Sequence, residues 1–337
     1  MTLTDMKTLA LFTGLLLALI PDGSVSAQST TKKHKVGALT KSLANPYFLR
    51  MKQGYEYAEK KLGVEVVFGS TPTEAADQTS GQPLVPADVE QLRILQSWLA
   101  EGSLEGLVVT PFRPASLNSA LTAASRKNLP IINIDELIPE ELAKADGIKI
   151  LTRIASNNVD VGKLDTQLVL NSVPKGSEVA VIEGDPTTTS SMDRVKGFTD
   201  AAKGGGLNVV ASQPANWDRK TARELAAKTL ADHPSLKAIF VANDDMALGV
   251  VNAVQAANAV GRVAVVSVDA TPDALEAVKQ GLLAGTVAQY PDAMAYLAIE
   301  TMVKKLNGEA VPEKVDSPVK LITKDNLSEA GKYYQDE

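Results

Sequence analysis

Two polar side chains, Asp269 and Gln289, stand where consecutive apolar runs of the chain end. The run at 263–268 is continuous, as in a strand buried on both faces, and 273–280 has the apolar spacing of a helix. A short second strand at 286–288 then leads into Gln289. In open α/β sheets such strand ends lie at the edge where ligands bind, so a binding site is expected here. The alternative is that Asp269 only caps the turn that follows it.

Further polar and aromatic side chains follow other predicted strands or open predicted helices. Carboxylates, amides and an arginine together suit a neutral polyhydroxylated ligand, because each sugar hydroxyl both donates and accepts hydrogen bonds. Aromatic rings can cover the apolar C–H face of a sugar. Taken singly, Asn45 and Asp244 could instead be helix caps. Tyr47, Phe48 and Trp217 could instead pack in cores. The full set is Asn45, Tyr47, Phe48, Asp135, Glu136, Arg194, Trp217, Asn243, Asp244, Asp269 and Gln289.

The motifs of common catalytic sites are missing from the sequence. It has no glycine fingerprint for a dinucleotide after the first strand, no GxxxxGK[ST] loop and no G-x-S-x-G elbow. Its only histidines are His34, in a polar lead-in, and His233, in a loop before a proline, so neither is placed as a general base or metal ligand. Cysteine is absent. These features favour a binding protein over an enzyme, with no cofactor and no metal.

Composition sets the broad class of the protein. A chain of 337 residues is long enough for two domains with cores, and 45% apolar with 22% charged residues is typical of a soluble globular protein. The net charge is −6, and no basic block with interleaved aromatics occurs. Nucleic acid is therefore not an expected partner.

The N-terminal region has the features of a secretory signal peptide. Residues 8–20, TLALFTGLLLALI, form an apolar run that is too short to span a bilayer comfortably. Small residues precede Gln28, which predicts cleavage between Ala27 and Gln28 and an exported mature protein. Translation could start at Met1 or at Met6, and the second start gives a cleaner Met-Lys opening. The alternative for the apolar run is a buried core helix or an uncleaved anchor.

From Lys35 onward, short apolar runs alternate with amphipathic stretches. Repeated strand–helix units produce parallel sheets with helices on both faces. The number of strands favours two sheets side by side over one. The predicted strands are 36–39, 64–68, 106–109, 131–134, 148–154, 178–182, 207–211, 238–241, 263–268, 286–288 and 319–323, and the predicted helices are 47–62, 87–100, 115–127, 159–171, 191–203, 221–231, 245–258, 273–280 and 291–307.

The sequence contains the segments LTKSLANPYF, NIDELI, EVAVIEG, VVASQPANWDR, VANDDMALGV and TVAQYPD. Together these segments resemble bacterial periplasmic sugar-binding proteins of the ribose/galactose type, the type I periplasmic binding proteins. The D-allose-binding branch is the most similar, and the resemblance covers essentially the whole mature length. NPYF or NDDMALG alone would mark only the wider superfamily, whereas the combination is specific.

The resemblance implies a sugar held between two lobes that close on it. Glu136 follows Asp135 as in the allose-type pattern, where ribose-type proteins carry Asp-Arg, and a Lys41–Glu136 pair at the rim is expected to contact additional hydroxyls of a hexose. Other differences from the allose branch, a Tyr-Phe pair for Phe-Trp and the loop at 185–192, leave pentoses and polyols as alternatives. The positions that match the family's sugar contacts are Asn45, Tyr47, Phe48 and Asp135 on one side, and Arg194, Trp217, Asn243, Asp269 and Gln289 on the other.

The implied fold is α/β, with two doubly wound parallel-sheet lobes joined by a three-segment hinge. A signal peptide at 1–27 precedes an N-terminal lobe of 35–156 plus 290–317 and a C-terminal lobe of 157–289 plus 318–337. The implied function is the periplasmic component of an ABC importer that delivers a monosaccharide to an inner-membrane permease. The alternative is a sensor that presents its ligand to a chemoreceptor or sensor kinase. A transcriptional regulator of related fold would need an N-terminal helix-turn-helix in place of the signal-like segment.

Overall fold

The structure is a computed structural model that describes residues 33–71 and 85–331. The predicted signal peptide and its cleavage site lie outside these residues. Within the described ranges, no helix combines the length and the apolar character needed to cross a membrane.

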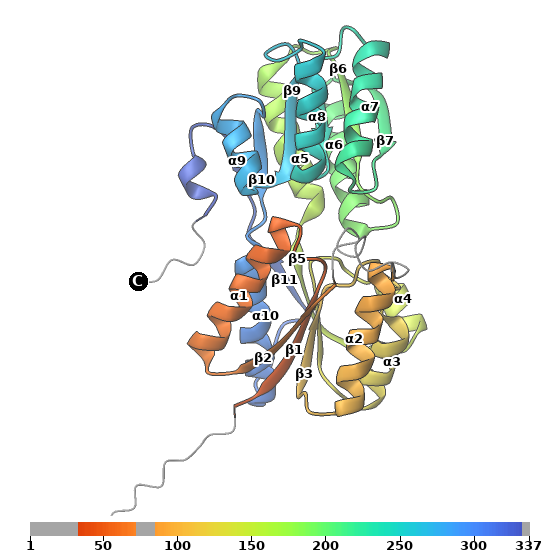
Figure 1. The fold of residues 1–337 in the computed structure, drawn as a ribbon, viewed down its shortest axis with the longest axis vertical. Helices are drawn as coiled ribbons and strands as arrows, with labels where there is room; N and C mark the ends of the chain where they lie inside the picture. Colours follow the sequence, from red (N-terminus) through yellow and green to blue (C-terminus); the bar gives the residue numbers. More distant parts are fainter. Residues whose placement is uncertain (1–32, 72–84, 332–337) are drawn as a thin grey trace, which may run out of the picture. The chain divides into compact units, whose positions relative to one another are not determined.

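The first of two sheets carries six strands in the order β11-β5-β4-β3-β1-β2, and every neighbouring pair is parallel. Helices α1 and α10 cover one face of the sheet and share one apolar cluster, and α2 and α3 cover the other face and share a second cluster (Figure 1). We call this sheet with its helices the first lobe. Its strands are β1 (Lys35–Thr40), β2 (Glu65–Ser70), β3 (Gly106–Val109), β4 (Ile131–Ile134), β5 (Ile150–Ser156) and β11 (Lys314–Ser317), and its helices are α1 (Pro46–Leu62), α2 (Ala87–Glu101), α3 (Asn118–Arg126), α4 (Glu140–Ala145) and α10 (Pro291–Leu306).

The second sheet has the order β12-β10-β9-β8-β6-β7, in which only β12 runs antiparallel to its neighbour. One large apolar cluster joins it to its helices, and we call the whole the second lobe. Its strands are β6 (Glu178–Glu183), β7 (Asn208–Pro214), β8 (Ala238–Val241), β9 (Ala264–Asp269), β10 (Gly285–Ala288) and β12 (Lys320–Ile322), and its helices are α5 (Asn158–Ser172), α6 (Thr189–Gly204), α7 (Arg219–Asp232), α8 (Asp244–Ala256), α9 (Pro272–Lys279) and the 3-10 helix η1 (Leu327–Glu329).

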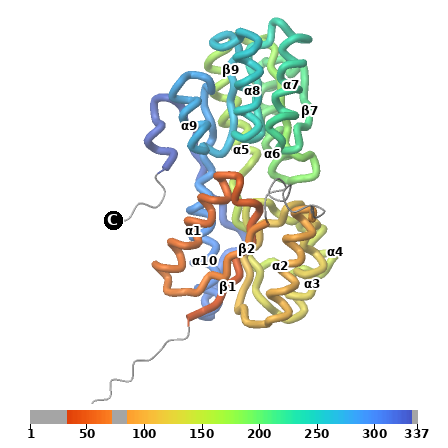
Figure 2. The backbone as a smooth tube through the Cα atoms, in the orientation of Figure 1, coloured from red at the N-terminus to blue at the C-terminus, as the bar shows by residue number. Residues whose placement is uncertain are grey.

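The chain passes between the two sheets three times, from β5 to β6, from β10 to α10, and from β11 to β12 (Figure 2). The predicted fold class, α/β with two parallel-sheet lobes, is confirmed. The residue bounds given above for the lobes stay a prediction.

Three described elements were not predicted: the strand β11, the helix α4 and the 3-10 helix η1. The strand Lys314–Ser317 is polar and pairs only along one edge, with β5, so it lacks the apolar run that marks a central strand. Helix α4 is only six residues long, EELAKA, which is shorter than a periodicity argument can detect.

Candidate ligand-binding site

On the first lobe, the start of α1 positions an aromatic pair beside Asp135. Asn45 caps the helix, because its Oδ1 accepts a hydrogen bond from the Tyr47 N–H at 2.9 Å. The Tyr47 hydroxyl donates to Asp135 Oδ1 at 2.8 Å, and the Phe48 ring packs edge-on with a centroid 5.1 Å from that of Tyr47. Asp135 directly follows β4 in the left-handed region, with φ 62°. The turn thus aims a carboxylate at the aromatic pair.

The structural roles considered as alternatives for these residues are observed. Asn45 is a helix cap, and Tyr47 and Phe48 are buried members of the apolar cluster under α1 and α10. Burial raises the pKa of the Tyr47 hydroxyl well above its usual value, and the carboxylates of Asp135 and Asp269 raise it further. The hydroxyl therefore stays protonated and acts as a donor at neutral pH.

On the second lobe, Arg194 projects from α6 and is only 4% exposed. Its Nε donates to Asn158 Oδ1 at 2.8 Å and its Nη1 donates to the Ala242 carbonyl at 2.7 Å. An unfixed surface side chain is therefore excluded. Two buried protein groups, the Asn158 side chain and the Ala242 carbonyl, hold its guanidinium in place.

Glycines bring α6 close enough to α5 to hold this arginine in place. A Cβ on Gly162 would lie 2.2 Å from the Arg194 carbonyl oxygen, and a Cβ on Gly197 would lie 2.1 Å from the carbonyl oxygen of Val159. Such distances are far below van der Waals contact. The two helices can therefore cross at this distance only because both positions lack a side chain.

Asp269 ends β9 next to Gln289, as the sequence predicted. Gln289 Nε2 donates to Asp269 Oδ1 at 2.6 Å, and Arg194 Nη1 lies 3.8 Å from the same oxygen. Burial raises the pKa of Asp269 well above its usual value, although the positive charge of Arg194 opposes the shift. The backbone φ of 123° at Asp269 is unusual for a residue with a side chain.

Asp244 has a role that the sequence analysis missed. It was considered as a helix cap, but Asn243 caps α8 through its Oδ1, which accepts from the Met246 N–H at 3.0 Å. Asp244 is fully buried, and burial raises its pKa to about 6. Its carboxylate accepts hydrogen bonds from Ser267 Oγ (2.5 Å), Thr286 Oγ1 (2.8 Å), the Thr271 N–H (2.7 Å) and Thr271 Oγ1 (3.1 Å).

These contacts also test the alternative that Asp269 only caps the turn that follows it. The turn after β9 is held by Asp244, which accepts a hydrogen bond from the Thr271 N–H, while the side chain of Asp269 interacts with Gln289 and Arg194. The interpretation of Asp269 as a mere turn cap is therefore wrong. Asp244 fastens β9, β10 and the turn together, which positions Asp269.

Trp217 lies between core and surface. Its backbone has φ 66°, and its ring covers Gly184 so closely that a Cβ there would lie 2.3 Å from the ring. The Arg194 guanidinium carbon is 6.0 Å from the ring centroid, within reach of a cation–π interaction. The indole is partly buried against the core of the second lobe, so packing and proximity to Arg194 coexist.

Lys41 and Glu136 pair as expected, but the pair is buried and does not lie at a solvated rim. Lys41 Nζ is 4.0 Å from Glu136 Oε2, but the Glu136 side chain is 0% exposed and that of Lys41 is 15% exposed. The ammonium group lies over the rings of Phe48 and Phe112, 5.8 and 5.9 Å from their centroids. Glu136 instead accepts hydrogen bonds from Thr189 and Ser190 at the start of α6.

Groups from both lobes meet at one place. The charges of Asp135, Asp269 and Arg194 all act on the Tyr47 hydroxyl, so two elements of the first lobe and two of the second converge there. Among the described residues, no cluster of three or more metal-ligating side chains occurs. Asn158, which holds Arg194, was not foreseen, because an asparagine near a helix start has the same pattern as an ordinary cap.

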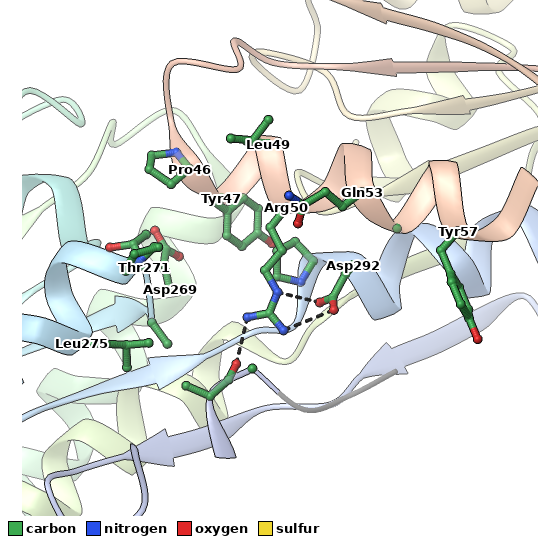
Figure 3. A pocket seen from close by; sticks show the side chains of 16 residues that line it. Pro46, Tyr47, Leu49, Arg50, Gln53, Tyr57, Asp269, Thr271, Leu275 and Asp292 are labelled. Atoms are coloured by element: carbon green, nitrogen blue, oxygen red, sulfur yellow. Dashed lines mark hydrogen bonds and ion pairs between the residues drawn. The ribbon is translucent and has the colours of Figure 1, made fainter. Parts of the chain in front are cut away.

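A cavity of about 500 Å³ lies beside this convergence. Figure 3 shows Tyr47 and Asp269 on its wall, together with Arg50, which bonds to Asp292 and to the Ala330 carbonyl. Its lining includes Tyr47 and Asp269 but none of the other nine predicted site residues.

Two doubly wound lobes, with convergent polar groups at their strand ends, define a two-lobed ligand-binding protein. The family model described as "Periplasmic binding protein domain" matches residues 36–310, so the chain belongs to that family of periplasmic binding proteins.

Relatives and solved structures agree with this assignment. The ribose import binding protein RbsB of Haemophilus influenzae is 31% identical over 317 residues, which cover 94% of this chain and 99% of that protein. The D-allose-binding periplasmic protein of Escherichia coli is 32% identical over 309 residues, with coverage of 91% and 94%. A periplasmic solute binding protein of an ABC transporter from Actinobacillus succinogenes, solved with bound D-allose, has a TM-score of 0.79 and 28% identity, covering 88% of this chain and all of that one. The Caulobacter myo-inositol binding protein, bound to myo-inositol, has a TM-score of 0.75 and 29% identity, with coverage of 93% and 98%.

Proposed function

We propose that the protein binds a monosaccharide or a closely related polyol between its two lobes and delivers it to an ABC import system. The observation that carries this proposal is the convergence of Tyr47 and Asp135 from one lobe with Arg194 and Asp269 from the other. Membership in a family of binding proteins, and relatives named for ribose and D-allose, support the same conclusion. The family is not one of enzymes.

The ligand is expected to use the hydrogen-bonding capacity that the protein leaves over. Arg194 has five N–H donors, of which Asn158 and Ala242 take two, so three remain for hydroxyl oxygens. A carboxylate can accept several hydrogen bonds, and among the described residues Asp135 accepts one from Tyr47 and Asp269 accepts one from Gln289. The proposed contacts come from Asn45, Tyr47, Phe48 and Asp135 on the first lobe and from Arg194, Trp217, Asn243, Asp269 and Gln289 on the second.

The choice among hexose, pentose and polyol depends on residues beside this set. The Lys41 ammonium lies 5.8 and 5.9 Å from the Phe48 and Phe112 ring centroids and 4.0 Å from Glu136, so Lys41 is the candidate for contact with an additional hydroxyl of a hexose. A D-allose-like hexose is favoured by this lysine together with the Asp-Glu pair at 135–136. Ribose and inositol stay as alternatives, since relatives named for both are similar to this chain.

The proposal includes location and partner. We infer that the apolar segment ending at Ala27 exports the protein to the periplasm and is then removed, and that the ligand-bound form docks on an inner-membrane permease. The lobe bounds of 35–156 with 290–317 and 157–289 with 318–337 are part of the same proposal, supported by the strand membership of the two sheets.

A thermal-shift screen tests the function. The purified protein would be heated with a panel of pentoses, hexoses and polyols, because a ligand that binds only the native state stabilises it by about 2.7 kcal/mol at a hundred times its Kd. At least one aldose or inositol should raise Tm by several degrees, and Asp269→Asn should reduce the shift. No shift with any member of the panel at millimolar concentration would contradict the proposal.

A further inference from the structure

Glu136 links the two lobes through protein groups alone. It follows Asp135 in the loop after β4, on the first lobe, and its side chain is fully buried. Oε1 accepts from the Thr189 N–H at 2.7 Å and from Thr189 Oγ1 at 2.8 Å, while Oε2 accepts from Ser190 Oγ at 2.7 Å. Both donors belong to the first turn of α6, on the second lobe.

The position of the Glu136 carboxylate at the N-terminus of α6 strengthens this contact. The first N–H groups of a helix have no partner inside the helix, and the positive end of the helix dipole favours a negative charge there. The first turn of α6 has no acidic residue, and its N-cap residue makes no side-chain capping bond. A carboxylate from the opposite lobe therefore supplies the capping that the helix itself lacks.

The contact spans the same two elements as the proposed ligand site. Asp135 precedes Glu136 in the loop, and Arg194 stands one turn beyond Ser190 on α6. When Glu136 holds the start of α6, Asp135 and Arg194 are held at a fixed separation. A sugar bound between them would thus meet a site whose two sides are already in position.

We propose that Glu136, with Thr189 and Ser190, forms a latch that keeps the closed arrangement of the lobes populated without ligand. The latch rests on the proposed function only in its consequence for sugar affinity. It makes Glu136 a positioning residue for closure rather than a contact to sugar hydroxyls. Because apparent affinity scales with the populated fraction of the binding-competent state, weakening the latch lowers sugar affinity without changing any ligand contact.

The test measures the separation of the lobes in the ligand-free protein. The chain has no cysteine, so Ser97→Cys on α2 and Ala227→Cys on α7, both exposed positions, allow a nitroxide pair to be attached to otherwise unmodified protein. Double electron–electron resonance then gives the distance distribution. The closed population is the one whose distance between the two labels matches the arrangement in the structure, in which Glu136 contacts Thr189 and Ser190.

We expect a closed population in the ligand-free labelled protein and a fall of at least tenfold in its closed-to-open ratio in Glu136→Ala, which corresponds to about 1.4 kcal/mol. Glu136→Gln, which keeps one acceptor oxygen, should give an intermediate ratio. Thr189→Val with Ser190→Ala removes the two hydroxyl donors from the other side and serves if Glu136→Ala does not fold. The matched control is Arg113→Gln, because Arg113 also joins the lobes, through Asp185 at 3.3 Å, but is 46% exposed. Its effect should be below twofold, as for other solvated pairs.

A ligand-free protein with no closed population, or latch variants with the distribution of the parent, would overturn the latch. Calorimetry on the same proteins separates this outcome from failure of the proposed function. If the variants open the lobes but no sugar binds the parent protein, the latch stands and the proposed function fails. If sugars bind but the variants change neither the distribution nor the affinity, the latch fails and the function stands.

Discussion

Asp165 is a buried acid without a hydrogen-bond partner, and its removal should change how stability depends on pH. It lies on α5 in the second lobe, with 0% exposure, and neither carboxylate oxygen has a partner among the described residues. Burial raises its pKa well above the usual value, and the nearby charge of Asp244 raises it further while that of Arg194 lowers it. The folded protein therefore keeps this acid protonated at a pH where the unfolded chain has released the proton.

The sign of the effect follows from proton linkage. With the folded pKa above the unfolded one, the native state binds more protons, so stability falls as pH rises. The fall begins near the unfolded pKa of about 3.9 and ends once pH passes the folded pKa. Within that window the slope from Asp165 alone is about 1.4 kcal/mol per pH unit. Asp165→Asn cannot ionise and should lose this contribution.

Urea unfolding at steps of half a pH unit from pH 4 to pH 8 would measure the contribution of Asp165 to the pH dependence of the free energy of unfolding. The free energy of unfolding of Asp165→Asn, relative to wild type, should rise by about 1.4 kcal/mol for each pH unit in the window and then level off. Any fixed penalty of the amide shifts the whole curve without changing this slope. Asp273→Asn, the same chemical change at an exposed position, is the matched control. Parallel curves for Asp165→Asn and wild type would refute the reasoning.

Three further predictions concern the site and its support. Arg194→Ala should weaken sugar binding at least tenfold by calorimetry, and it should also lower Tm, because hydrogen bonds to charged donors contribute about 1.5–3 kcal/mol and two buried acceptors lose theirs. Unchanged affinity would remove Arg194 from the site. Trp217→Phe should abolish the change in tryptophan fluorescence that sugar binding causes. Trp98→Phe should keep that change, because the Trp98 ring packs on the glycines of β1 and β2. The opposite result would place Trp217 outside the cleft. Gly197→Ala should lower the unfolding free energy by about 1–3 kcal/mol, since its Cβ would lie 2.1 Å from the Val159 carbonyl oxygen. Wild-type stability in denaturant would contradict the close crossing of α5 and α6.

Strands with continuous apolar runs were predictable, because burial on both faces leaves a signal in the sequence itself. All five parallel-paired strands of the second lobe lie within two residues of their predicted ends, except at the C-terminal end of β7. Strand β11 was not predicted because an edge strand such as KVDS needs no apolar run. The position of Asp269 beside Gln289 was predictable because both residues follow the ends of neighbouring parallel strands, and the two side chains share a 2.6 Å hydrogen bond.

Contacts between distant segments were not predictable in the same way. Glu136 and Thr189 are 53 residues apart, and nothing in either segment alone indicates that one caps the helix of the other. The rim interpretation of Glu136 assumed that a charged residue stays solvated, and three donors from the opposite lobe overturn that assumption. Asp165 likewise stands in an amphipathic helix, where an aspartate ordinarily faces solvent.

A crystal structure of the protein with the sugar that gives the largest thermal shift tests the central claim most directly. We expect sugar oxygens within about 3.2 Å of Asp135 on the first lobe and of Arg194 and Asp269 on the second. A sugar seated instead in the neighbouring cavity, against Arg50 and Leu275 and away from Arg194, would contradict it.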